Sequence, residues 1–193
     1  MKKNGQFLGL MLIFFIVLSC NHTSVDNRTN KKNSDSIQLA GLLHNMLKYH
    51  NSRSKIIDFE IIVKDSFQIG LDTNHLKNTL SDLKSSGYFS EHFLKNYENI
   101  GRYVDKKLKN GKYYNEINFP FQDSDPWTFF QDDAGEYWNN FKISDLIINK
   151  DLATLQWYLN PQEKYKVNFK KENDSWKVFY LEGFDYDKML KEQ

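Results

Sequence analysis

The chain has a single cysteine, and the position of that cysteine limits how the protein can be built. Cys20 closes a leader that starts with the basic Met1-Lys2-Lys3 and continues as an almost wholly apolar run over residues 7–18. This order is typical of a secretory signal, and the run is shorter than the about 20 apolar residues that cross a bilayer. Since no second cysteine follows, the exported part cannot form an intramolecular disulfide. Its stability must come from a hydrophobic core, which an aromatic content of 16% can supply.

The end of the leader, Val17-Leu18-Ser19-Cys20, resembles the lipobox of bacterial lipoproteins. The resemblance implies that residues 1–19 are a signal peptide, that cleavage occurs before Cys20, and that the new terminal cysteine is acylated. More than one acyl chain makes such an attachment to the membrane stable. The implied location is the bacterial cell envelope, on the periplasmic face or the cell surface, with the outer membrane favoured. The alternative is an ordinary secretory signal in which the cysteine stands by chance.

The charge balance excludes one class of partner. The chain has 26 Lys and Arg against 25 Asp and Glu, and loss of Lys2 and Lys3 with the leader leaves the remainder slightly acidic. Such a chain has no long-range positive field, so nucleic acid is not expected as a partner. The length that remains fits one domain.

The folded part is expected to start where the polar stretch after Cys20 gives way to apolar periodicity. Residues 20–36 have one aliphatic side chain, Val25, and no aromatic one, so we expect a flexible tether. Residues 37–193 are expected to form a single domain. Its first helix, capped by Ser36, is expected to run from Ile37 to about Asn51, with a buried stripe at Ile37, Ala40, Leu43, Met46, Leu47 and His50. His44 and His50 lie six residues apart, which does not suit a metal site, and are interpreted as core-edge and surface histidines.

The middle of the chain changes from strand signals to helix signals. Residues 57–63 and 67–71 alternate in polarity around a turn at residues 65–66, which predicts a hairpin. Asp72 or Thr73 is expected to cap a helix that ends at Gly87, and Ser90 a second helix that ends at Gly111. The second helix carries an apolar stripe (Phe93, Tyr97, Ile100, Val104, Leu108) and a basic cluster (Lys106, Lys107, Lys109). The basic cluster fits the negative end of the helix dipole, and the alternative is a basic binding patch.

The last third of the chain is strand-like. Strands are expected over 138–148 with a break near Asp145, over 152–159, and as a hairpin of 165–169 with 176–180, before a short helix capped by Asp185. In this hairpin Phe169 and Trp176 are expected to be buried on facing strands. Residues 113–136 show no period and are expected to form a long ordered loop. Helices followed by an antiparallel meander predict an α+β fold, with the N-terminal helices packed on one face of a curved antiparallel sheet.

The final hairpin, KYKVNFKKENDSWKVFYLE, resembles the closing strands of cystatin-like domains of the nuclear-transport-factor-two type. The chain also resembles a family of uncharacterised bacterial lipoproteins with that fold. The resemblance lies in the lipobox and in the segments KSSGYFSEHFL and DSDPWTFFQD. The resemblance covers about residues 37–190 and implies a fold and a location, since no activity is established for the family. Its members are considered as ligand-binding, cell-envelope or toxin-immunity proteins.

Motifs of established chemistry are missing from the sequence. No two glycines after the leader are close enough for a phosphate-binding loop, and neither Gly-x-Ser-x-Gly nor His-Glu-x-x-His occurs. All five histidines precede residue 93, whereas the best cluster of acidic residues lies after residue 122. We therefore assign no catalytic residue, no metal and no cofactor.

The best candidate for a binding site is the acidic and aromatic stretch within the long loop. Its residues are Asp123, Asp125, Trp127, Phe130, Gln131, Asp132 and Asp133. Asp125 and Asp132 could orient a ligand, while Trp127 and Phe130 offer apolar area, and Trp127 is expected to be exposed or half-exposed at the open end of the sheet. Alternatives are turn-forming acids in a purely structural closure, a Ca²⁺ site, and a carboxylate with a raised pKa beside an aromatic ring.

These features predict a membrane-anchored lipoprotein with a non-enzymatic domain that binds a protein or a small molecule. Two alternatives stay open. One is a small hydrolase or isomerase that uses a carboxylate in the sheet cleft, by analogy with enzymes of this fold. The other is an immunity protein that blocks a secreted toxin. A cavity lined by Asp and Tyr favours the enzyme, whereas a filled interior favours contact through the surface.

Overall fold

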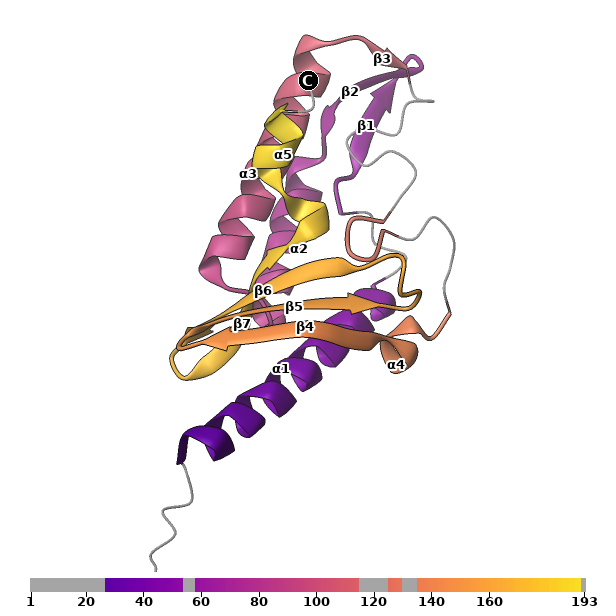
Figure 1. Cartoon of the computed structure of the whole chain (residues 1–193). Coiled ribbons are helices and arrows are strands. Elements are labelled where there is room, and N and C mark those ends of the chain that lie inside the picture. Colours follow the sequence, from indigo (N-terminus) through magenta and orange to yellow (C-terminus); the bar gives the residue numbers. More distant parts are fainter. Residues whose placement is uncertain (1–26, 54–57, 115–124, 130–134, 192–193) are drawn as a thin grey trace, which may run out of the picture.

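The computed structural model describes residues 27–53, 58–114, 125–129 and 135–191 (Figure 1). The helices are α1 Asn27–Ser52, α2 Thr73–Ser86, α3 Glu91–Asn110, α4 Tyr137–Asn140 and α5 Tyr186–Lys191, with a 3-10 turn η1 at Glu182–Phe184. The strands are β1 Ile61–Lys64, β2 Phe67–Leu71, β3 Tyr113–Tyr114, β4 Lys142–Asn149, β5 Leu152–Tyr158, β6 Tyr165–Glu172 and β7 Ser175–Leu181. Within these ranges the chain is α+β, as expected, with two antiparallel sheets rather than one: β1-β2-β3 and β4-β5-β6-β7.

Helix α1 starts earlier than predicted. It begins at Asn27, so Ser36 lies inside the helix and does not cap it. Asp35, which the sequence placed in the tether, is 5% exposed because its carboxylate accepts hydrogen bonds from Lys171 and Trp176 of the β6–β7 hairpin. These contacts fix the rotation of the helix, and Ile37, predicted to be buried, is 74% exposed on the other side. Residues 20–26 and the leader lie outside the described residues.

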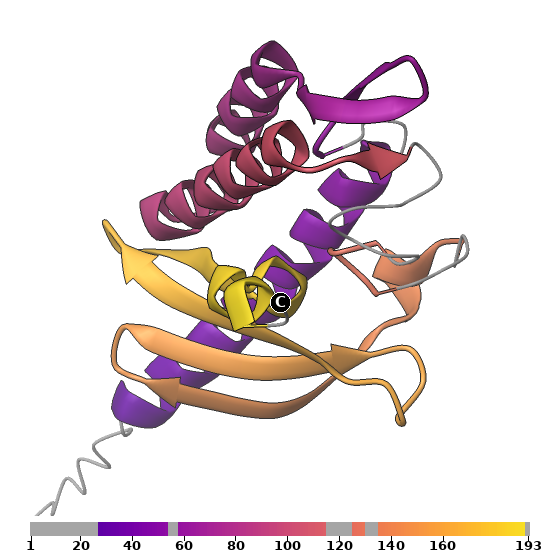
Figure 2. The ribbon, with the colours of Figure 1, turned by 90° about the horizontal axis from the view of Figure 1, so that it is seen from above.

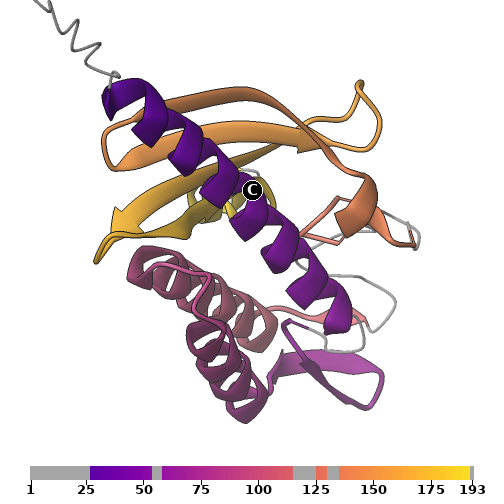
Figure 3. The same cartoon turned by 90° about the horizontal axis from the view of Figure 1, so that it is seen from below.

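The four-stranded sheet packs its inner face on α1, which crosses the molecule diagonally and contacts both edge strands, β4 and β7 (Figure 3). Leu39, Leu43, Met46 and Leu47 of α1 are fully buried. On the sheet, Leu155, Trp157, Val167, Phe169, Trp176 and Val178 are buried. The prediction that Phe169 and Trp176 are buried on facing strands of one hairpin is confirmed.

Helix α3 lies between the two sheets and packs against β2 on one side and β7 on the other, with α2 beside it (Figures 1 and 2). The caps expected from the sequence are present: Asp72 accepts from Asn74 N and His75 N, Ser90 accepts from Phe93 N, and Gly87 has a φ of 73°. Segment 88–90 also pairs with β7, since Ser90 N donates to Val178 O and Val178 N donates to Tyr88 O. The helical pair is thereby joined to the sheet through the backbone.

The two predicted hairpins turn at residues whose backbone is left-handed. Asp65 and Ser66 between β1 and β2 have φ of 50° and 66°, and Asn173 and Asp174 between β6 and β7 have 50° and 61°. Two consecutive positive φ values match the right-handed twist of the flanking strands, and Asn and Asp tolerate them. The predicted break near Asp145 is confirmed as a register shift between Ser144 and Ile147.

The predicted strand start at Trp138 is wrong, because residues 137–140 form the short helix α4 and β4 begins at Lys142. Tyr137 is buried there and its hydroxyl reaches α1. This tertiary contact outweighs the preference of the local aromatic residues for a strand. Of the long loop predicted over residues 113–136, the structure describes β3, residues 125–129 and residues 135–136. The other residues of this loop lie outside the described ranges.

Candidate functional site

The segment Asp125 to Phe129 is the described part of the predicted binding stretch. Its turn is closed locally, since the Asp125 carbonyl accepts from Phe129 N at 2.6 Å and the Asp125 carboxylate accepts from Trp127 N at 2.7 Å. The Phe129 ring stacks on Tyr165 of β6 at 5.2 Å between centroids. Asp123, Phe130, Gln131, Asp132 and Asp133 lie outside the described residues, so their expected roles rest on the sequence alone.

The expectation that Trp127 is exposed is wrong, because its side chain is 1% exposed. The indole lies among aromatic rings, with Phe184 of η1 at 4.9 Å, Phe89, just before α3, at 5.6 Å and Phe93 of α3 at 6.2 Å between centroids. Gly183 permits this arrangement, since a Cβ at that position would stand 1.8 Å from the Pro126 carbonyl oxygen. Trp127 therefore closes the core and offers no surface to a partner.

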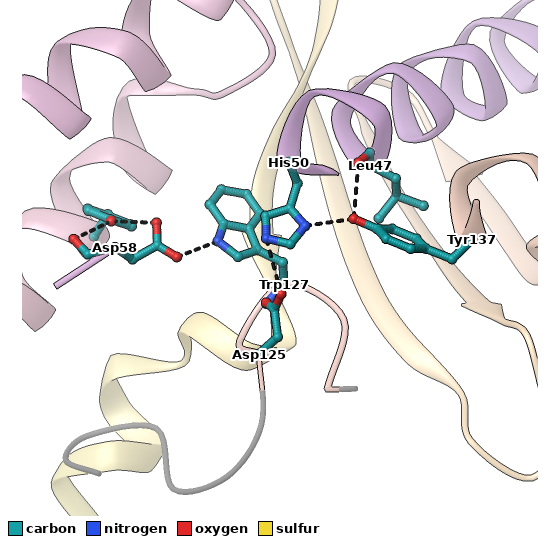
Figure 4. A network of polar contacts seen from close by, with 7 residues as sticks. Leu47, His50, Asp58, Asp125, Trp127 and Tyr137 are labelled. Atoms are coloured by element: carbon teal, nitrogen blue, oxygen red, sulfur yellow. Dashed lines mark hydrogen bonds and ion pairs between the residues drawn. The ribbon is translucent and has the colours of Figure 1, made fainter. Parts of the chain in front are cut away.

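His50 at the end of α1 connects this turn to α4 (Figure 4). Its Nδ1 lies 2.7 Å from the Tyr137 hydroxyl, and its Nε2 lies 3.2 Å from Oδ2 of Asp125. The ring stacks on Trp127 at 5.1 Å between centroids. The Tyr137 hydroxyl is 3.3 Å from the Leu47 carbonyl oxygen and can donate to it. Both ring nitrogens of His50 thus have protein partners, and together they hold the turn and α4 on α1.

Asp58 occupies the other side of the indole (Figure 4). Its Oδ2 accepts from Trp127 Nε1 at 2.7 Å, and its Oδ1 accepts from the Tyr97 hydroxyl at 2.8 Å. Loss of surrounding water raises the pKa of the Asp58 carboxyl, although the bonds from Trp127 and Tyr97 and the nearby His50 and Arg53 act in the opposite direction. Burial, followed by the negative charge of Asp58, holds the pKa of Tyr97 well above its usual range.

Arg53, directly after α1, is a buried cation near this network. It is 8% exposed, and its guanidinium carbon lies 5.3 Å from the centroid of the Tyr49 ring. Its Nε and Nη2 and the Tyr49 hydroxyl are buried without a hydrogen-bond partner in the described part of the chain. Burial raises the pKa of Tyr49, and the positive charge of Arg53 partly offsets that effect.

The His50 nitrogens and the Asp58 oxygens all lie within hydrogen-bond distance of protein groups. These contacts hold α1, the Asp125–Phe129 turn, α3 and α4 together. Sequence reasoning missed His50, Asp58 and Tyr137 as members of one network. No spacing could have revealed it, because Asp58 and Trp127 are 69 positions apart and His50 and Tyr137 are 87 apart.

Comparison with known proteins finds no matching family model, no similar curated protein and no similar solved structure. In the described ranges no three His, Cys, Asp or Glu side chains are grouped to hold a metal ion. No helix in the part of the chain that the structure describes is both long and apolar enough to cross a membrane.

Proposed function

We propose that this protein is a lipoprotein of the bacterial cell envelope whose folded domain binds a partner without catalysing a reaction. The leader and Cys20 support the anchor. The filled interior around Trp127 supports binding through the surface, since the described part of the core leaves its carboxylates and His50 engaged with other side chains. The observation that carries the proposal is this engagement: the acid and base groups nearest the predicted site are used to hold the fold together.

A cystatin-like fold of the nuclear-transport-factor-two type belongs to the same proposal. It is supported by the antiparallel order β4-β5-β6-β7 and by the long helix α1 against one face of that sheet. The partner is a protein or a small molecule, and a secreted toxin blocked by an immunity protein is one form that it could take. A toxin gene beside the gene for this chain would favour that form.

One experiment tests both the anchor and the binding. The wild type and Cys20→Ser are expressed in a bacterial host, labelled with radioactive palmitate and cross-linked in intact cells. We expect palmitate on the wild type only, with Cys20→Ser released from the membrane fraction or left as an uncleaved precursor. We expect cross-linked partners with the anchored protein and fewer or none with the misplaced variant. Recovery of processed Cys20→Ser in the membrane fraction would show that the lipoprotein assignment is wrong.

A further inference from the structure

A cavity of about 600 Å³ lies between the C-terminal half of α3 and the short helix α5. Its volume is in the range of small-molecule sites, which span about 300–1,000 Å³. Two asparagine side chains contribute to its wall, and the other residues that define its character are Arg102, Tyr103, Lys106, Lys107, Tyr186 and Leu190. The wall therefore combines three cations with two phenol rings, and among the described residues no acidic side chain lines it.

The charges of this α3–α5 groove are only partly neutralised within the protein. Arg102 pairs with Glu98 one turn earlier on α3. Lys106 and Lys107 take part in none of the ion pairs of the described residues. Arg102 and Lys106 lie four residues apart on α3, a spacing at which like charges on a helix repel each other. An anion bound in the groove would attract both cations and offset their mutual repulsion.

The third lysine of the basic cluster behaves differently. Lys109 pairs with Asp105 at 2.7 Å and does not line the groove. The helix dipole accounts for a cation near the end of α3, but its effect falls off within the last turn. Arg102 lies two turns before the end of the helix at Asn110, so the dipole does not explain why cations continue along this face.

The aromatic side of the groove is built for an apolar group. The Tyr103 and Tyr186 rings meet edge to face with 6.0 Å between centroids, and the Lys107 ammonium lies 5.6 Å from the Tyr103 centroid. Leu190 of α5 is 45% exposed beside them. The Tyr103 hydroxyl is buried and has no hydrogen-bond partner among the described residues, so the wall holds a donor that the described protein groups leave unused.

We propose that the α3–α5 groove binds a small organic anion, in which a phosphate or carboxylate group is attached to an apolar body. Lys106 and Lys107 bind the anionic group through charge-assisted hydrogen bonds, and Arg102 adds positive potential. The apolar body packs on Tyr186 and Leu190. Such an anion could come from a soluble metabolite or from a lipid headgroup with its acyl chains. The inference does not depend on the anchor, and it concerns a surface distinct from the Asp125–Phe129 turn.

The test is a set of calorimetric titrations of the purified chain with defined probes. Phenyl phosphate represents a soluble aromatic anion, and dihexanoyl phosphatidic acid below its micellar concentration represents the lipid source. Inorganic phosphate supplies the anion alone and benzyl alcohol the ring alone. We expect at least one of the first two probes to bind roughly tenfold or more tightly than either partial probe, because both halves of the groove are then occupied.

The double variant Lys106→Gln/Lys107→Gln is expected to weaken that binding by roughly tenfold or more, since it removes two charged donors. Lys166→Gln/Lys170→Gln, on exposed positions of β6, is the matched control with the same change of net charge and should bind as the wild type does. Backbone ¹⁵N shifts around Lys106 and Tyr186 locate the bound probe. The proposal is overturned if neither compound probe binds at millimolar concentration, if the β6 control loses as much affinity, or if benzyl alcohol binds equally well.

Discussion

Replacement of Trp127 tests the central claim about the predicted site, that its largest side chain holds the core together. The indole is fully buried among Phe89, Phe93 and Phe184, and truncating a buried Trp to Ala costs about 3–5 kcal/mol. The same change leaves Oδ2 of Asp58 without its donor, which adds about 1–3 kcal/mol. This sum is comparable with the total stability of many domains, about 5–15 kcal/mol, so Trp127→Ala should be largely unfolded or close to it.

Trp127→Phe separates the two contributions, because a phenyl ring keeps much of the apolar contact and loses only the indole N–H and some volume. We expect a loss of about 1–3 kcal/mol in the free energy of unfolding, measured by urea denaturation followed by far-ultraviolet circular dichroism. Trp138→Phe is the control, since Trp138 is half-buried at the edge of the core and should lose less. The reasoning fails if Trp127→Ala costs under about 1 kcal/mol, because a buried indole cannot be removed so cheaply.

Three further predictions concern charge and capping. Asp58→Asn should gain stability relative to the wild type as the pH rises from about 4. The pKa of the buried Asp58 carboxyl is raised in the folded state, so the wild type loses stability as this carboxyl ionises, whereas the asparagine of the variant does not titrate. A constant difference in the free energy of unfolding between the two proteins, measured by urea melts across that range, would contradict this. Lys171→Met should lower the free energy of unfolding by about 3–5 kcal/mol, because it leaves the Asp35 carboxylate buried without its cation. The double variant with Asp35→Asn should recover part of that loss, and additive losses in the double-mutant cycle would mean that the pair is not coupled. Ser90→Ala should destabilise the protein by about 1 kcal/mol through loss of the cap on α3, whereas Ser85→Ala on the exposed side of α2 should change the melting temperature little; equal effects would argue against the cap.

Elements with local signals could be predicted from the amino-acid sequence. The caps at Asp72 and Ser90, the left-handed Gly87 and the turns at residues 65–66 and 173–174 depend on the conformational preferences of a few neighbouring residues. The apolar stripe of α3 was also readable, because its period of three and four residues fixes which face must be buried. The same local logic predicted the antiparallel hairpin of β6 and β7 with its buried Phe169 and Trp176.

Long-range contacts fix which face of α1 is buried, where that helix begins and which role Trp127 has. Asp35 of α1 accepts hydrogen bonds from Lys171 and Trp176 of the β6–β7 hairpin, in a stretch that the sequence predicts to be a tether, and Ile37 is exposed. His50, Asp58 and Trp127 read as separate polar and aromatic residues in sequence. They form one network because chain segments far apart in sequence meet between α1, α3 and the sheet, and such long-range pairing leaves no periodic trace in the sequence.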